Sequence, residues 1–91
     1  MLNEKELEKE LKTLEKAINK KNDAIATAEK AYADADAVYQ SQPSVYNESG
    51  VVLAHSDVIN LRAELFLLEQ RQQLLTKQLE HLREQNGPIN G

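Results

Sequence analysis

Apolar residues recur at alternating spacings of four and three on both sides of Pro43, and this pattern constrains the fold more than any other feature. Such spacing places one continuous apolar stripe along an α-helix. The first stripe, with Lys21 as its single polar member, is Leu7, Leu11, Leu14, Ile18, Lys21, Ile25, Ala28, Tyr32, Ala35 and Tyr39. The second, with Gln72 as its single polar member, is Val51, Ala54, Val58, Leu61, Leu65, Leu68, Gln72, Leu75, Leu79 and Leu82. The sequence therefore predicts two long helices, over about residues 3–40 and 51–86.

Capping residues stand at the expected limits of both helices. Asn3 and Glu6 have the spacing of a capping box, in which each side chain accepts a hydrogen bond from the other residue's backbone N–H. Gly87 is suited to the left-handed conformation that often follows a helix, and Pro88 cannot continue one. Residues 87–91 are therefore expected to be a tail or the start of a linker.

The stretch "YQSQPSVYNESG", residues 39–50, separates the two stripes. Pro43 breaks a helix, and the Ser, Asn and Gly residues that follow it are typical of turns. An antiparallel alignment with Leu14 opposite Leu79 places Tyr32 opposite Leu61 and keeps both stripes in phase. The sequence thus predicts an all-α fold, a two-helix antiparallel coiled-coil hairpin over residues 1–86 with its turn at about 41–50. A short helical turn within "PSVYNES" is compatible with this interpretation.

The same alignment places Lys21 opposite Gln72, so that the polar member of each stripe meets the other. One interpretation is that this polar layer specifies the register, because slipped alignments would bury either group against apolar neighbours. The other is that Lys21 contacts a carboxylate of a partner. The first is favoured, because Glu15 and Glu69 are placed to hold the Lys21 ammonium.

The hairpin seam leaves large apolar residues over on the second helix. These form two adjacent columns: Val52, Ile59 and Phe66, and Leu53, Leu67 and Leu74. The first helix offers beside its seam only Ala17, Ala24, Ala31 and Val38. Scattered apolar side chains on a surface are common. Six large ones in adjacent columns favour an interaction surface, and a two-helix hairpin buries little by itself, so self-association is expected.

Composition excludes several kinds of chemistry. The 91 residues include no cysteine, which rules out disulfides and thiolate metal sites. No catalytic constellation, phosphate loop or cofactor motif occurs, and His55 and His81 lie too far apart along one helix to share a metal. The net charge of −4 with interspersed signs does not suit direct nucleic-acid binding. No run is long and apolar enough for a membrane span. The sequence predicts a soluble cytoplasmic protein that is not an enzyme and binds no small molecule.

The chain resembles the N-terminal coiled-coil domain of hantavirus nucleoproteins. The likeness lies in "ELEKEL" near the start, "AEKAY" late in the first helix and the turn pattern Pro43, Asn47, Ser49. It extends to Val58, Leu61, Leu65, Leu68, Leu75 and Pro88. The resemblance implies an intramolecular antiparallel hairpin with a role in nucleoprotein assembly. That family has basic side chains midway along its first helix, where this chain has only Lys20, Lys21 and Lys30.

Two functions from different classes follow. The first is an oligomerisation module, the N-terminal assembly arm of a negative-strand RNA virus nucleoprotein, present in the host cytoplasm and the virion. The second is a complete small adaptor or phage-encoded inhibitor that binds a host protein through the outer face of the second helix. The final "NGPING" reads as a cut linker in the first case and as a natural terminus in the second.

Overall fold

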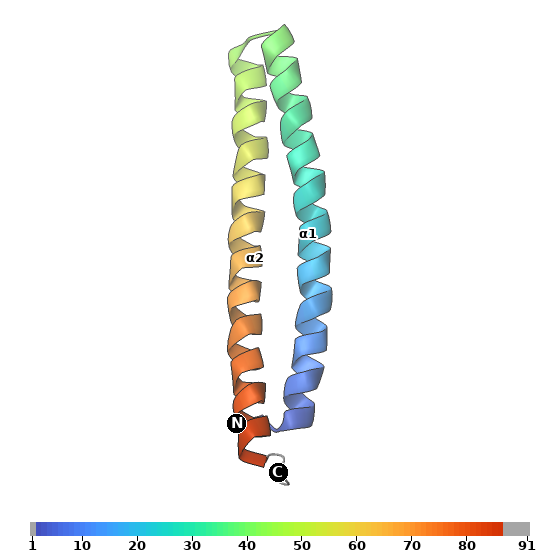
Figure 1. Ribbon diagram of the computed structural model, residues 1–91. Helices are drawn as coiled ribbons and strands as arrows, with labels where there is room; N and C mark the ends of the chain where they lie inside the picture. The colour runs from blue at the N-terminus through green and yellow to red at the C-terminus, as the bar shows by residue number, and fades with distance from the viewer. Residues whose placement is uncertain (1, 87–91) are drawn as a thin grey trace. The chain divides into compact units, whose positions relative to one another are not determined.

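Two helices account for nearly all of the chain that the structure describes, residues 2–86. In the computed structural model α1 spans Glu4–Ser41 and α2 spans Val45–Asn86, with no strand in the described range (Figure 1). Segments of α1 pack against segments of α2, so the predicted all-α helical hairpin is confirmed. The predicted roles of Gly87 and Pro88, and the tail at 87–91, fall outside the described residues.

The capping box at the start of α1 forms as predicted. The Glu6 N–H donates to Asn3 Oδ1 over 2.9 Å, and the Asn3 N–H donates to Glu6 Oε1 over 3.0 Å. Just beyond it, Leu7 is fully buried and Leu2 packs against the same core. The start of α1 is therefore held both by hydrogen bonds and by apolar packing.

The predicted turn at 41–50 is too long, because α2 begins at Val45 rather than near residue 51. Ser44 acts as the N-cap of α2, its Oγ accepting from the Asn47 N–H over 3.0 Å. The Asn47 side-chain amide donates to the Gln42 carbonyl oxygen over 2.7 Å and closes the turn. Gly50, expected to give the turn freedom, lies in the second turn of the helix without a positive φ.

Contacts group the described chain into two compact units. The first unit joins Met1–Asn19 to Phe66–Gly91. Its core is made of buried Leu7, Leu14, Leu75 and Leu79, with Leu2, Leu11, Leu68 and Leu82 packed against them. At the edge of this core, Arg83 reaches Glu4 over 3.2 Å and Glu8 over 3.4 Å. Leucines from both stripes thus form the core of this unit, as the 4-3 spacing predicts.

The second unit is the continuous segment Lys20–Leu65, which contains the turn. Its buried core residues are Ile25 and Val58, the latter only 2 % exposed. Tyr32 stacks on His55, and Arg62 forms an ion pair with Glu29. The core of this unit is thinner than that of the first, because α1 supplies mainly alanine here.

The predicted alignment of the helices is displaced by about six residues of α2, which is nearly two helical turns. In the second unit Tyr32 meets His55 rather than Leu61. In the first unit Arg83 bonds Glu4 and Glu8, which lie nearer the N-terminus than the alignment places them. The early start of α2 is the physical cause, since a shorter turn brings lower-numbered residues of α2 opposite α1.

Candidate interaction surface

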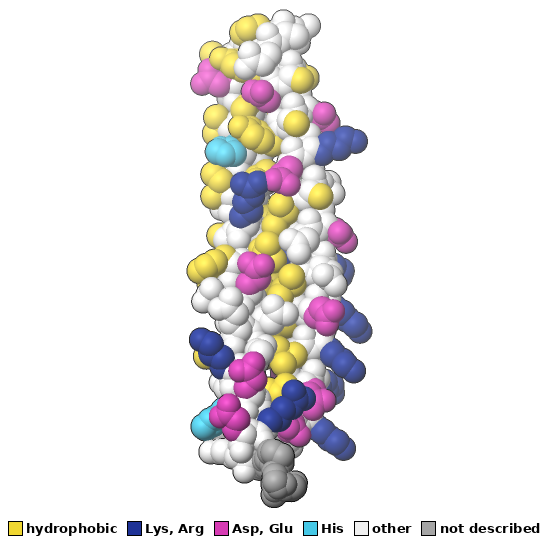
Figure 2. Space-filling view, viewed as in Figure 1, with side chains coloured by type: hydrophobic (Ala, Val, Ile, Leu, Met, Phe, Trp, Pro, Cys, Tyr) yellow, Lys and Arg dark blue, Asp and Glu magenta, His cyan; other side chains and the backbone are white. Residues whose placement is uncertain are grey.

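Large apolar side chains lie exposed along α2. Nine large hydrophobic residues are exposed in the described chain, whereas six are buried and the other large apolar residues of the two stripes are half-buried. The exposed set is Val38, Val45, Tyr46, Val52, Leu53, Ile59, Phe66, Leu67 and Leu74. All of them except Val38 belong to α2. Figure 2 shows hydrophobic side chains along the outer edge of α2, at the left of the view, as well as between the helices.

The six residues that the sequence analysis assigned to this surface are all exposed. In the second unit these are Val52, Leu53 and Ile59, and in the first unit Phe66, Leu67 and Leu74. Phe66 is the largest of them and is 57 % exposed. The α2 stripe, as we name these six residues, leaves more apolar surface in water than a single hairpin needs to expose.

Sequence analysis missed Val45 and Tyr46, which are 82 % and 87 % exposed. Both were assigned to the turn, where an exposed apolar residue needs no partner. The structure makes them the first residues of α2, so they extend the apolar surface to the turn end. Ser44 could have indicated this helix start, because serine is a preferred N-cap residue and its hydroxyl can accept from the backbone N–H three residues later.

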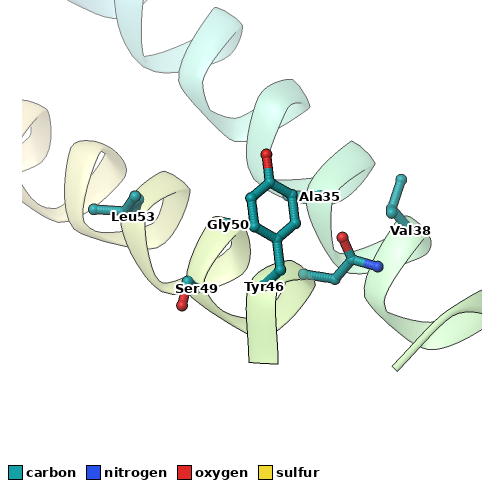
Figure 3. Close-up of a pocket in the computed structure, with 7 residues that line it drawn as sticks. Ala35, Val38, Tyr46, Ser49, Gly50 and Leu53 are labelled. Atoms are coloured by element: carbon teal, nitrogen blue, oxygen red, sulfur yellow. The ribbon is translucent and has the colours of Figure 1, made fainter. Parts of the chain in front are cut away.

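A groove lies along one side of the second unit, between α1 and α2. Near the turn it is a hollow of about 300 Å³, bordered by Ala35 and Val38 on α1 and by Tyr46, Asn47, Ser49, Gly50 and Leu53 on α2 (Figure 3). One turn further along both helices a hollow of about 590 Å³ follows, bordered by Ala24, Thr27, Ala28, Ala31, Asp57, Asn60, Leu61 and Glu64. We name the two hollows together the alanine groove. Ala24, Ala31 and Val38, which lie beside the seam of the first helix, border this groove.

Gly50 contributes to the open end of the alanine groove. A Cβ atom added at Gly50 would meet nothing within 4 Å. Glycine in a helix interior costs about 1 kcal/mol relative to alanine. No packing contact explains the glycine, and its effect is to keep the groove open between Tyr46 and Leu53 (Figure 3).

The net negative charge of the chain comes from the residues near the turn. Residues 31–61 contain four carboxylates, Asp34, Asp36, Glu48 and Asp57, and neither Lys nor Arg. The rest of the chain has eleven acidic and eleven basic residues, so this stretch accounts for the whole net charge of −4. None of the four carboxylates forms an ion pair within residues 2–86. The turn end is therefore an acidic surface with exposed apolar residues on it.

The two residues assigned to a polar layer lie in different units. The Lys21 ammonium pairs with Glu64 over 3.4 Å, so the expected partners Glu15 and Glu69 are wrong. Gln72 is half-buried in the first unit. The pairing of Lys21 with Gln72 stays a prediction, because the two residues belong to different units.

The described chain shows no grouping of side chains suited to hold a metal ion. His55 stacks on Tyr32, and His81 shares a hydrogen bond with Gln85 over 3.3 Å. Neither helix, over residues 2–86, combines the length and the hydropathy that a membrane crossing requires.

No protein-family model, curated protein or solved structure matches this chain.

Proposed function

We propose that this protein is a protein–protein interaction module that self-associates through the α2 stripe. The observation that carries the proposal is the set of nine exposed large hydrophobic residues, eight of which lie on α2. A helix that is apolar on both its inner and outer faces is normally covered on both. In this protein α1 covers only the inner face of α2.

The exposed area supports a second copy as the covering partner. Each of the six side chains of the α2 stripe is more than half exposed, from 52 % at Ile59 to 69 % at Leu53. A standard protein–protein interface buries roughly 800 Å² on each partner, much of it apolar. Association of two copies through α2 would therefore supply the apolar burial that one hairpin lacks.

The electrostatics of the stripe also allow two identical surfaces to meet. Between Val52 and Leu68 the positions that face away from α1 carry uncharged side chains, including Ser56, Ile59 and Ala63. A two-fold symmetric contact brings each residue near its own copy or near a symmetry mate, which is costly when those residues are charged. An uncharged apolar stripe avoids this repulsion. Phe66 is the best candidate for the energetic centre, because large aromatic residues dominate such contacts.

The test introduces a charge at the proposed centre. Phe66→Glu should shift the protein to monomer in sedimentation velocity while its helical circular dichroism persists, because Phe66 lies outside the buried core. Ala26→Glu is the matched control, since Ala26 is exposed on α1 and gains the same charge. If Phe66→Glu and the parent have the same mass distribution, the stripe is not the contact surface.

An assembly arm of a negative-strand RNA virus nucleoprotein is the more specific form of this function. It rests on the resemblance in "ELEKEL", "AEKAY" and the turn residues, and the helical hairpin agrees with it. A reading frame that continues past Gly91 into a basic RNA-binding domain would support this form. If the parent protein proves monomeric, the α2 stripe is instead assigned to a different protein, as in an adaptor or inhibitor.

A further inference from the structure

We propose that the alanine groove binds a basic amphipathic helix of another protein. This inference goes beyond self-association, since it concerns the groove between α1 and α2, which shares only Leu53 with the α2 stripe. Its occupant would insert apolar side chains between α1 and α2 and present Lys or Arg along its edges. Shape, apolar lining and charge each support this occupant.

The shape of the groove suits a third helix. The α1 side of the groove carries small side chains at helical spacing, namely Ala24, Ala28, Ala31 and Ala35. These side chains project only a short distance from the helix. Small residues let a neighbouring helix approach closely, and the facing wall offers Leu53 and Leu61 as apolar contacts. Tyr46 stands at the open end beside Gly50 (Figure 3), in the exposed position typical of an aromatic contact residue.

The charges along the groove select a cationic occupant. Asp57 and Glu64 border the wider hollow. Asp34 follows Ala31 by three residues and Thr27 by seven, which places it on the same side of α1. Glu64 already pairs with Lys21, whereas Asp34 and Asp57 form no ion pair within the described residues. A helix with Lys or Arg on its edges would complement both aspartates.

The same charges argue against the other kinds of occupant. A second copy would bring one acidic turn end against another, and like charges across an interface are unfavourable. Nucleic acids and anionic lipid surfaces require basic side chains. The residues that border the two hollows include neither Lys nor Arg. A basic segment of a different protein is the occupant that meets no such repulsion.

Gly50 provides a way to close the groove without disturbing the hairpin. Since an added Cβ meets nothing within 4 Å, a larger side chain there extends into the hollow rather than into the protein. Leucine is also a better helix former than glycine. Gly50→Leu should therefore keep or raise the melting temperature while it blocks the groove, which separates lost binding from lost folding.

The experiment measures fluorescence anisotropy of a labelled 18-residue Leu/Lys peptide, with leucines on one face and lysines on the other, about the length of a five-turn helix. The full chain should bind this peptide, and a matched Leu/Glu peptide should bind at least tenfold more weakly. Gly50→Leu should weaken binding of the Leu/Lys peptide at least tenfold. Ala26→Leu, which places the same side chain at an exposed site outside the groove, should change it less than twofold.

Charge variants test the electrostatic part separately. Asp34→Asn with Asp57→Asn should weaken binding at least threefold and reduce its dependence on salt. Asp36→Asn with Glu48→Gln removes the same charge from residues that do not border the groove, and should have a smaller effect. Equal effects of the two pairs would overturn the proposal, because binding would then follow net charge alone. It is also overturned if the Leu/Lys peptide does not bind, if Gly50→Leu binds it like the parent, or if Gly50→Leu changes the oligomeric mass.

Discussion

The ring of Tyr32 stacks on the imidazole of His55, with centroids 4.9 Å apart and planes inclined by 24°. This contact joins α1 to α2 within the second unit and fixes their register there. It also shows that the residue of α2 opposite Tyr32 lies six positions earlier in the sequence than the predicted Leu61, a difference of nearly two helical turns.

The stacked pair should show measurable coupling. In a double-mutant cycle of Tyr32→Ala and His55→Ala, followed by urea unfolding, we expect a coupling free energy of about 0.5–1.5 kcal/mol. The pair Tyr32→Ala and Ser56→Ala serves as control, because Ser56 is exposed on the outer side of α2. Additive effects of Tyr32→Ala and His55→Ala would contradict the stacking and with it the register.

Replacing Gly50 by alanine should stabilise the hairpin. Gly50 lies inside α2, has no positive φ and leaves room for a Cβ atom. We therefore expect the free energy of unfolding to rise by about 0.5–1 kcal/mol. Thermal unfolding monitored by circular dichroism provides the measurement. A lower melting temperature for Gly50→Ala would show that residue 50 belongs to a turn, as the sequence pattern suggested.

Leucine-to-alanine substitutions should lower the free energy of unfolding far more at buried positions than at exposed ones. Leu7 is 0 % exposed in the core of the first unit, so Leu7→Ala should lower the free energy of unfolding by about 2–5 kcal/mol. Leu53→Ala removes the same atoms from an exposed site of the α2 stripe, so in the dissociated chain it should change the free energy of unfolding by less than about 0.5 kcal/mol. Urea unfolding of both variants at concentrations that dissociate the oligomer provides the measurement, and equal losses there would contradict the exposure of Leu53.

The two polar residues of the apolar stripes can be tested together. Lys21 and Gln72 are half-buried, and Lys21 has a solvent-accessible partner in Glu64. Such a pair contributes about 0–1 kcal/mol, less than burying leucine at a seam position. The double variant Lys21→Leu with Gln72→Leu should therefore melt at a higher temperature than the parent. A clearly lower melting temperature would show that these polar groups are required in the folded state.

Helix capping and core burial could be predicted from the sequence, because they depend on residues a few positions apart in one helix. The register between the two helices could not, because it depends on the length of the turn. The capping box of Asn3 and Glu6 and the burial of Leu14 and Leu79 follow from spacing within one helix. The register depends on where α2 begins, and several alignments keep two 4-3 stripes in phase. Ser44 has the chemistry of both a turn residue and an N-cap, so composition alone did not place that boundary.

Some residues of the interaction surface could likewise be predicted from the sequence, and others could not. Phe66 and Leu74 could be assigned to it because they fall outside the seam of a single long helix. Tyr46 could not, because its exposure on α2 depends on the shortened turn. The alanine groove also escaped prediction, since Ala24 and Ala31 border space that only the positions of both helices define.

Sedimentation equilibrium of the unmodified chain over a wide concentration range tests the central claim, self-association through α2, most directly. We predict a mass of at least two chains at micromolar concentration, falling toward one chain on dilution, because the apolar stripe is covered only in the oligomer. A mass of one chain that stays constant up to the highest concentration reached would contradict the claim.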